Sequence, residues 1–270
     1  MLSFPTAKIN LGLQILRKRG DGFHDLETVF YPVGWQDALE VVANGEEPLQ
    51  LTMSGLPVAG DLESNLCYKA WKLIAADYSL PPLQAHLHKM IPMGAGLGGG
   101  SSDAAFMLKL LNEVNHLGIN EDKLCSYAAQ LGSDCAFFVR NKPAFATGRG
   151  EVLEDFPLDL SNYYLQIVMP EVTVPTAAAY SWITPMDNRK DIQSILQQSI
   201  ATWKTELIND FQQPVCERFP IIAELISQLY NEGAIYAAMS GSGAAVFGIF
   251  DKEPAYTFSE LKSWKGKMIV

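Results

Sequence analysis

A run of glycines is the feature that most restricts what this chain can form: residues 94, 96, 98, 99 and 100 are all glycine. The run leads directly into residues 101–115, whose apolar side chains recur at helical spacing. Glycine has no side chain to cover the backbone N–H groups, and the start of a helix adds about half a positive charge. This combination predicts a loop that binds a phosphate. The alternative, a tight turn, does not need so many glycines.

The sequence around the glycines excludes the common nucleotide-binding loops. Gly94, Gly96 and Gly99 match the dinucleotide pattern G-x-G-x-x-G. That pattern requires an acidic residue at the end of a second strand, but residues 113–122 have the character of a helix end and a helix start. A P-loop would need lysine where Gly100 stands, and the protein-kinase motifs H-R-D and D-F-G do not occur. We therefore expect other segments to supply the cations that balance a phosphate.

The charge balance narrows the range of partners. The chain has 20 Lys and Arg against 30 Asp and Glu, a formal net charge of −10. An acidic surface repels phosphate, which argues against nucleic acid and membranes as partners, although one local pocket can still be positive. The uncharged run 233–250 is interrupted by the small residues 240–243, which favours two strands around a turn over a membrane span.

The cysteines and the start of the chain predict a location. Cys67, Cys125, Cys135 and Cys216 form no C-x-x-C pair, so they indicate neither a zinc site nor a dithiol centre. The first residues lack the basic and apolar regions of a signal peptide. We therefore expect a reducing compartment, the cytoplasm. The sequence does not indicate an oligomeric state.

The pattern predicts an α+β protein of two domains. Alternation predicts strands and a spacing of three to four residues predicts helices. We expect strands at 7–13, 26–33, 38–42, 49–53, 84–90, 137–139 and 144–147, and helices at 64–78, 101–115 and 121–131. Later we expect a strand at 163–169, helices at 191–200 and 214–231, strands on both sides of 240–243, a helix, and a final strand at 267–270. The pattern of expected strands and helices changes within residues 150–160, which predicts domains at residues 1–155 and 156–270.

Some polar residues could carry chemistry, and each also has a plainer explanation. Lys8 lies on the polar face of the first predicted strand, near Asn10, and could be a solvated strand lysine. Asp134 precedes the apolar run 135–139, so it is either the N-cap of a short helix or a general base in a dry site. Ser101 or Ser102 is the expected N-cap of the helix at 101–115.

Three segments together resemble the motifs of one family. Residues 6–11 (TAKINL), 96–105 (GLGGGSSDAA) and 240–247 (SGSGAAVF) are similar to the three motifs of the GHMP kinases, named for galactokinase, homoserine kinase, mevalonate kinase and phosphomevalonate kinase. Within that family, residues 19–24 (RGDGFH) and 131–134 (LGSD) resemble the kinases that act on 4-diphosphocytidyl-2-C-methyl-D-erythritol. The resemblance covers nearly the whole chain. It implies an N-terminal domain like ribosomal protein S5 domain 2 and a C-terminal ferredoxin-like domain.

The resemblance implies ATP-dependent phosphorylation of the 2-hydroxyl of that substrate, giving the 2-phosphate and ADP in the non-mevalonate route to isopentenyl diphosphate. Asp134 matches the family's base, with Lys8 beside it and Asn10 in support. A base is needed because an alcohol is a poor nucleophile until its proton has an acceptor. The residues implied for ATP lie near the adenine and in the glycine loop: Asn65, Leu66, Pro92, Met93, Gly94, Ala95, Gly96, Leu97, Gly98, Gly99, Gly100, Ser101 and Ser102.

The resemblance assigns the cytidine end of the substrate to Phe23, His24, Thr176 and Tyr180. His24 matches a residue that reads cytosine, and Phe23 and Tyr180 match rings that stack on it, which suits the choice of a base. Without the resemblance, His24 could be an ordinary turn histidine and Tyr180 part of a helix core. Phe23 stands where the family usually has tyrosine, so a hydroxyl is lost.

The negative charge of ATP and a diphosphate substrate requires compensation. Mg²⁺ is the expected cofactor, with Ser101 or Ser102 as a possible ligand and no carboxylate assigned. Lys8, Lys89 and the basic cluster 17–19 are the expected counter-charges.

Two alternatives to this function stay open. One is a GHMP kinase for another small alcohol, such as homoserine or mevalonate, against which residues 22–24 argue. The other is a noncatalytic nucleotide-binding protein, against which Lys8 and Asp134 argue, since a pure binder has no use for a base. The chain also departs from the family's usual Val-Pro at Cys135-Ala136, which places an oxidisable thiol beside Asp134.

Overall fold

The computed structural model describes residues 1–186 and 189–269. The chain forms two compact units that interleave along the sequence. Unit 1 comprises Met1–Ala7, Trp35–Met93 and Gly98–Asn141, and unit 2 comprises Lys8–Gly34, Gly94–Leu97 and Lys142–Val270. Because these units follow contacts rather than chain order, the domains 1–155 and 156–270 stay a prediction.

Unit 1 contains a sheet with the strand order β1-β4-β6-β5. Its strands are β1 (Leu2–Ser3), β4 (Ala38–Val42), β5 (Leu49–Gly55) and β6 (Leu83–Lys89). β4 pairs antiparallel with β6, whereas β5 runs parallel to it. The alternation that predicted β6 is confirmed, because Ala85 and Leu87 are buried and His86 is exposed.

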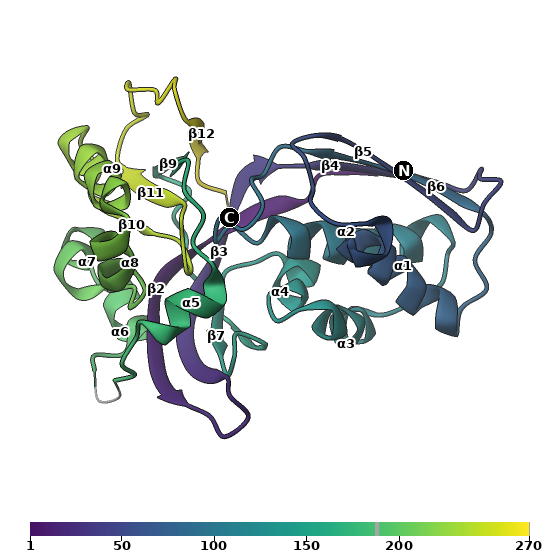
Figure 1. Cartoon of the computed structure of the whole chain (residues 1–270), viewed down its shortest axis with the longest axis horizontal. Helices are drawn as coiled ribbons and strands as arrows, with labels where there is room; N and C mark the ends of the chain where they lie inside the picture. Colours follow the sequence, from purple (N-terminus) through teal and green to yellow (C-terminus); the bar gives the residue numbers. More distant parts are fainter. Residues whose placement is uncertain (187–188, 270) are drawn as a thin grey trace. The chain divides into compact units, whose positions relative to one another are not determined.

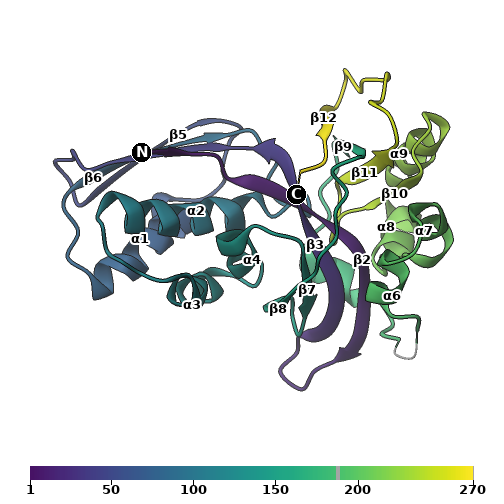
Figure 2. The ribbon, with the colours of Figure 1, turned by 180° about the vertical axis from the view of Figure 1, so that it is seen from behind.

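Helices cover one face of this sheet. Figures 1 and 2 show the four of them on the same side of the strands: α1 (Leu66–Asp77), α2 (Gly99–Val114), α3 (Glu121–Leu131) and α4 (Cys135–Arg140). A 3-10 turn, η1 (Leu62–Ser64), precedes α1. The side chain of Asn65 caps α1 by accepting the N–H of Cys67. The helices predicted at 64–78, 101–115 and 121–131 are confirmed, with small shifts at their ends.

Two details of unit 1 differ from the prediction. Residues 137–139 form part of α4 and not a strand, and Cys135 to Val139 are all buried. A short apolar run has no period that separates a strand from a buried helix, which explains the error. The N-cap of α2 is Gly98 in the left-handed conformation, not Ser101 or Ser102.

Unit 2 contains two further sheets. The first has the order β2-β3-β7-β8 and consists of β2 (Thr6–Lys18), β3 (His24–Gln36), β7 (Ala144–Thr147) and β8 (Val152–Asp155). The second has the order β10-β11-β9-β12 and consists of β9 (Tyr164–Met169), β10 (Tyr236–Met239), β11 (Val246–Phe250) and β12 (Lys262–Lys267). All pairings in the second sheet are antiparallel.

Short helices accompany the second sheet. They are α5 (Thr176–Ser181), α6 (Ile192–Leu196), α7 (Ile200–Glu206), α8 (Gln212–Arg218) and α9 (Pro220–Asn231), and Figures 1 and 2 show α7 to α9 on one side of β10 and β11. Leu225 and Leu229 of α9 share a core with Met239 and Val246. This core anchors the turn between β10 and β11.

Four predictions for unit 2 need correction. The helix predicted at 214–231 is α8 and α9, because Phe219 has a non-helical backbone and Pro220 begins a new helix. The helix predicted at 191–200 ends at Leu196, before α7. Between β11 and residue 269 the structure describes no helix, and its last strand, β12, ends at Lys267, so residues 268–269 of the predicted final strand are not in a strand. Val270 lies outside the described residues. None of the helices described is long and apolar enough to cross a bilayer.

Candidate active site

The glycine loop passes from unit 2 into unit 1 just before α2. Gly94, Gly96 and Gly98 all have positive φ, at 65°, 77° and 71°. Gly98 caps α2 without a side-chain hydrogen bond. The first turn of α2 therefore presents N–H groups that no capping side chain covers, as an anion-binding helix start requires.

The turn at residues 240–243 packs on the first half of this loop. The hydroxyl of Ser240 donates to the carbonyl of Gly96 at 2.8 Å, and the N–H of Ala245 donates to the carbonyl of Ala95 at 3.1 Å. A Cβ atom on Gly96 would lie 2.1 Å from the carbonyl oxygen of Ser240. Gly96 is therefore required both by its conformation and by the closeness of the turn.

Lys8 and Asn10 lie on β2 beside the same loop segment. The backbone N–H of Lys8 donates to the carbonyl of Leu97 at 2.9 Å, and its Nζ donates to Oδ1 of Asn10 at 2.7 Å. Lys8 is only 3% exposed, and its Nζ lies 4.7 Å from the centre of the Phe30 ring. The explanation as a solvated strand lysine is therefore wrong. A buried ammonium is stable only among partners that compensate its charge.

Asp134 lies in unit 1, directly before α4. Asp134 is the N-cap residue of α4, as one of its two interpretations predicted, but its side chain makes no capping hydrogen bond to that helix. Its loop lies at the start of α2, because a Cβ on Gly132 would be 4.0 Å from Oγ of Ser101. The hydroxyl of Ser133 donates to Oδ1 of Asp134 at 3.2 Å. Since Lys8 belongs to unit 2, its pairing with Asp134 stays a prediction.

Cys135 is not the oxidisable thiol that the sequence suggested. It is fully buried. Burial raises the pKa of this thiol to about 12, although a hydrogen bond with Ser101 acts in the opposite direction. The thiolate is the reactive form of cysteine, so Cys135 is expected to be inert.

Lys89 is not available to balance phosphate. Its side chain is wholly buried and ion-paired with Asp37 and with Asp103, the latter at 2.7 Å. Burial lowers the pKa of Lys89, but the two carboxylates outweigh that effect and leave the pKa raised. The two acidic side chains therefore already hold this ammonium between them, so it is not free to meet a phosphate.

The basic cluster 17–19 is also largely compensated by its neighbours. Arg17 pairs with Asp25 at 2.5 Å. Arg19 pairs with Asp21 at 3.0 Å and with Asp25 at 2.8 Å. Lys8 is thus the predicted counter-charge whose surroundings best fit that role.

The residues predicted near the adenine lie together in unit 1. Asn65 caps α1, and its Nδ2 lies 3.2 Å from Sδ of Met53. A Cβ on Gly100 would lie 3.1 Å from Cε of Met93 and 3.8 Å from Cδ1 of Leu66. The start of α1 and the start of α2 are therefore neighbours, as a single nucleotide site on unit 1 would require.

The residues predicted for cytidine form a group in unit 2. The rings of His24 and Tyr180 are stacked, with centres 5.0 Å apart and planes at 21°. Tyr180 also meets the edge of Phe211 at 4.8 Å. Burial, followed by the charge of Lys18, lowers the pKa of His24. This favours the uncharged imidazole, which has one donor and one acceptor nitrogen.

Phe23 and Thr176 complete this group at its edges. Phe23 is 54% exposed, and the Arg149 guanidinium lies 4.9 Å from its ring centre. Oγ1 of Thr176 lies 3.1 Å from Oγ of Ser242 in the turn 240–243. The structure thus brings Tyr180 against His24, while the ring of Phe23 stays available to a ligand.

Comparison with known proteins decides the family. The model of the GHMP kinases N terminal domain matches residues 65–142, and that of the GHMP kinases C terminal matches residues 192–260. The chain belongs to the GHMP kinase family. This membership confirms the α+β two-domain fold class expected from the motifs.

Two similar relatives of this GHMP kinase carry the same name. A 4-diphosphocytidyl-2-C-methyl-D-erythritol kinase of Parabacteroides distasonis is 46% identical over 99% of this chain and 100% of the relative. The enzyme of the same name from Bacteroides fragilis is 49% identical over 95% of this chain and 94% of its own. The resemblance stated from the motifs is thereby confirmed.

Solved structures agree with this placement. The crystal structure of a 4-(cytidine 5'-diphospho)-2C-methyl-D-erythritol kinase has a TM-score of 0.80 and 31% identity, and covers 92% of this chain and 89% of its own. A homoserine kinase from Cytophaga hutchinsonii has a TM-score of 0.69 at 14% identity over 98% of this chain and 95% of its own, which shows the shared fold alone.

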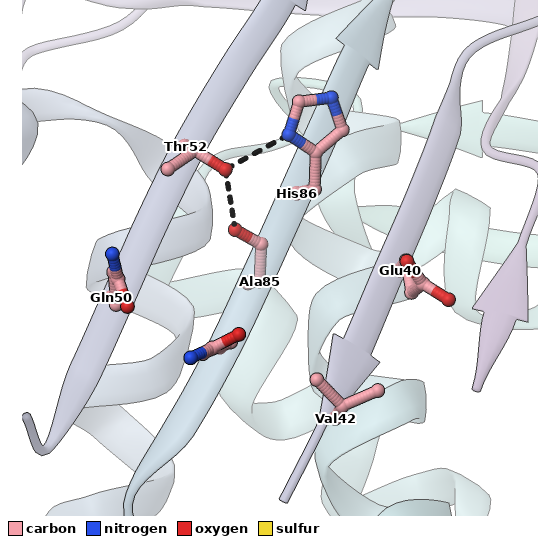
Figure 3. A pocket seen from close by; sticks show the side chains of 7 residues that line it. Glu40, Val42, Gln50, Thr52, Ala85 and His86 are labelled. Carbon is pink, nitrogen blue, oxygen red and sulfur yellow. Dashed lines mark hydrogen bonds between the residues drawn. The ribbon is translucent and has the colours of Figure 1, made fainter. Parts of the chain in front are cut away.

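The GHMP kinase also has surface cavities that the predicted site residues do not line. A shallow cavity of about 120 Å³ lies on the face of the unit 1 sheet opposite the helices, with Glu40 and His86 in its lining. Figure 3 shows Thr52 in this cavity, bonded to His86 and to the carbonyl of Ala85. A larger cavity of about 460 Å³ lies in unit 2 beside Trp182. No predicted site residue lines either cavity.

Sequence reasoning missed residues that support the site. Phe211, Arg149 and Asn209 belong to no recognised motif, and their part in the site follows only from contacts with distant residues. A metal centre built by the protein alone was not predicted, and the described residues contain no group of three His, Cys, Asp or Glu that could hold a metal.

Proposed function

We propose that this GHMP kinase transfers the terminal phosphoryl group of ATP to the 2-hydroxyl of 4-diphosphocytidyl-2-C-methyl-D-erythritol. The products are the 2-phosphate and ADP, and the reaction belongs to the non-mevalonate route to isopentenyl diphosphate. One observation carries the choice of substrate: a relative of that name is 46% identical over 99% of the chain. The broader class, a small-molecule kinase that phosphorylates an alcohol with ATP, follows from family membership.

Asp134 is the general base of the proposed reaction. Its position beside the start of α2 supports this role, because the N–H groups there would hold the phosphates. The carboxylate accepts the proton of the 2-hydroxyl as the new O–P bond forms and the bond to ADP breaks. Lys8 and Asn10 orient the hydroxyl and stabilise negative charge, which the burial of the Lys8 ammonium supports.

The stacked pair of His24 and Tyr180 receives the cytosine. Its neutral imidazole offers a donor and an acceptor to the edge of the base. Phe23 adds an exposed ring. Thr176, whose hydroxyl lies 3.1 Å from that of Ser242, is a further proposed substrate contact. A homoserine or mevalonate kinase would have no use for such a group of rings.

Mg²⁺ accompanies ATP in this proposal. The buried Oγ of Ser102 has no hydrogen-bond partner within the described part of the chain, so an oxygen donor is present at the start of α2. Ser102, with Ser101, is the proposed protein ligand, and the phosphates of ATP supply further oxygens. When bound, the ion screens the negative charge of the phosphates.

The remaining partners follow from charge. ATP and the cytidine-linked alcohol are the proposed small-molecule partners. A net charge of −10 argues against nucleic acid and membranes. The scattered cysteines, free in the structure, support a cytoplasmic location.

The substrate is tested by measuring ADP release with four alcohols in turn: the cytidine-linked methylerythritol, homoserine, mevalonate and galactose. We expect kcat/KM for the first to exceed the others by at least about 100-fold, since the buried polar groups of the site would lack partners with the others. A preference for homoserine or mevalonate would overturn the substrate. ATP binding without any turnover would favour the noncatalytic alternative.

A variant of His24 tests the cytidine site separately. His24→Ala should raise KM for the cytidine substrate and leave KM for ATP unchanged.

A further inference from the structure

The link between α7 and α8 carries a buried asparagine outside the three family motifs. Asn209 is 3% exposed. The segment around it runs beside β2: the N–H of Leu13 donates to the carbonyl of Ile208, and the N–H of Asp210 donates to the carbonyl of Leu13, both at 2.9 Å. Asn209 is thus fixed to the strand that carries Lys8 and Asn10.

The side chain of Asn209 uses both its amide nitrogen and its amide oxygen in hydrogen bonds to backbone groups. Nδ2 donates to the carbonyl oxygens of Met239 and Gly241, each at 2.8 Å. Oδ1 accepts the N–H of Phe211 at 2.9 Å. The two carbonyls belong to the residues on either side of Ser240. One side chain therefore fixes the backbone of the turn on both sides of that serine.

Ser240 connects the turn to the residues of the proposed reaction site. Its hydroxyl accepts the N–H of Asn10 at 3.3 Å and donates to the carbonyl of Gly96 at 2.8 Å. Asn10 in turn accepts Nζ of Lys8 at 2.7 Å and donates to Oγ1 of Thr28 at 3.0 Å. A single buried hydroxyl thus joins the glycine loop to the strand of Lys8.

The turn 240–243 packs too closely against Gly96 and Asn10 to move independently of them. The carbonyl oxygen of Ser240 lies 2.1 Å from where a Cβ on Gly96 would be, and a Cβ on Gly241 would lie 3.3 Å from Oδ1 of Asn10. Any shift of the turn must therefore move the glycine loop or Asn10. Close-packed interiors transmit such displacements rather than absorb them.

We propose that Asn209 is a positioning residue for phosphoryl transfer: it fixes the turn 240–243 so that Ser240 holds Asn10, and through it Lys8, against Gly96. Asn209 does not touch substrate in this proposal. The proposal rests on the proposed roles of Lys8 and Asn10. Its effect is on the alignment of reacting groups, which affects kcat more than the binding of either substrate.

The test compares Asn209→Ser with Gln212→Met. Oε1 of Gln212 accepts the N–H of Met239 at 2.9 Å, so its loss also weakens the anchoring of β10 but leaves both turn carbonyls bonded to Asn209. We expect Asn209→Ser to lower kcat by about 10- to 100-fold with little change in KM, as misplacement of reacting groups does. We expect Gln212→Met to keep kcat within about threefold. Equal losses of kcat in the two variants would overturn the proposal.

A double-mutant cycle separates positioning from general destabilisation. If Asn209 acts through Ser240, Asn209→Ser should have little further effect on kcat once Ser240→Ala is present. Losses that multiply would show independent roles and contradict the proposal. Each variant is assayed well below its melting temperature.

Hydrogen exchange supplies a readout that does not depend on which alcohol is the substrate. In Asn209→Ser, the amides of Asn10 and Ala245 should exchange faster, because the turn that protects them is released. In Gln212→Met they should exchange as in the parent chain. Unchanged exchange in Asn209→Ser would overturn the proposal even if the enzyme is active. If the two amides exchange faster in Asn209→Ser but the parent chain does not turn over the cytidine substrate, the proposed function is contradicted and the structural role of Asn209 is not.

Discussion

The buried group of Lys89, Asp37 and Asp103 places one positive charge between two carboxyl groups. Oδ1 of Asp37 also accepts the N–H groups of Met90, at 2.5 Å, and Ile91, at 2.8 Å. This fixes the chain just before the glycine loop. Burial raises the pKa of Asp103 to about 8 even though Lys89 lowers it. The carboxyl therefore retains a proton in the folded protein at pH values where it is ionised in the unfolded chain.

The proton on Asp103 predicts how stability depends on pH. The folded state binds this proton more tightly than the unfolded chain, so Asp103 favours folding at low pH, and the advantage is lost as pH rises from about 4 to about 8. Asp103→Asn cannot titrate. Its free energy of unfolding, relative to the parent chain, should therefore rise with pH by on the order of 1 kcal/mol per unit across that range.

Urea unfolding at pH 5, 6, 7 and 8 measures this difference. Asp122→Asn is a matched control, because the Asp122 side chain is 88% exposed. The free energy of unfolding of the control should follow the parent chain at every pH. Parallel curves for Asp103→Asn and the parent chain would show that Asp103 is ionised in the folded state.

Residue-scale predictions from the sequence succeeded where a motif is local. The residues of the glycine loop and the residues before α4 could be named because their neighbours in the chain define them. Burial could not be read in the same way. Lys8 and Lys89 both occur in alternating stretches, yet one is bonded to Asn10 and the other is enclosed by Asp37 and Asp103. Asn10 is two residues from Lys8 and was predicted beside it, whereas Asp37 and Asp103 lie 52 and 14 residues from Lys89, so no local pattern joins them to it.

The glycine loop and the turn 240–243 act as one element in unit 2. Gly94 and Gly96 share a left-handed conformation, but their surroundings differ. A Cβ on Gly94 would meet nothing within 4 Å, whereas a Cβ on Gly96 would lie 2.1 Å from the carbonyl oxygen of Ser240. A substitution at Gly94 therefore reports backbone strain alone, whereas one at Gly96 reports strain together with the clash against the turn.

The pair Gly94→Ala and Gly96→Ala tests this packing. Gly94→Ala should cost about 1–2 kcal/mol of stability, the strain of a left-handed alanine. Gly96→Ala should cost more and should lower turnover further, because the turn must move away from the loop. Melting temperature and kcat report the two effects. Equal changes in both variants would show that the turn does not press on the loop.

The order of helices and strands was largely predictable from periodicity. β4, α1, β6, α3 and β9 follow the predicted ranges within a few residues. The errors arose where the local pattern carries no period, as in the buried run of α4, or where a proline divides an apolar stretch, as between α8 and α9. The N-cap of α2 was wrong because a left-handed glycine replaced the expected serine.

At the scale of the whole molecule, the chain returns to each unit more than once. The glycine loop contributes Gly94–Leu97 to unit 2 and the start of α2 to unit 1. The sequence pattern along the chain does not show this interleaving. It predicted a single domain boundary near residue 155. The family motifs carried the functional prediction because each motif is local, although together they involve both units.

The measurement that tests the account most directly is the turnover of Asp134→Asn with ATP and 4-diphosphocytidyl-2-C-methyl-D-erythritol. The amide keeps the shape of the side chain but cannot accept the hydroxyl proton. We expect kcat to fall by at least about 100-fold, as for loss of a general base, with the affinity for ATP unchanged. Ser133→Ala, which removes the hydrogen bond to Asp134 and keeps the carboxylate, should lose far less. Turnover of Asp134→Asn close to that of the parent chain would contradict the proposed mechanism.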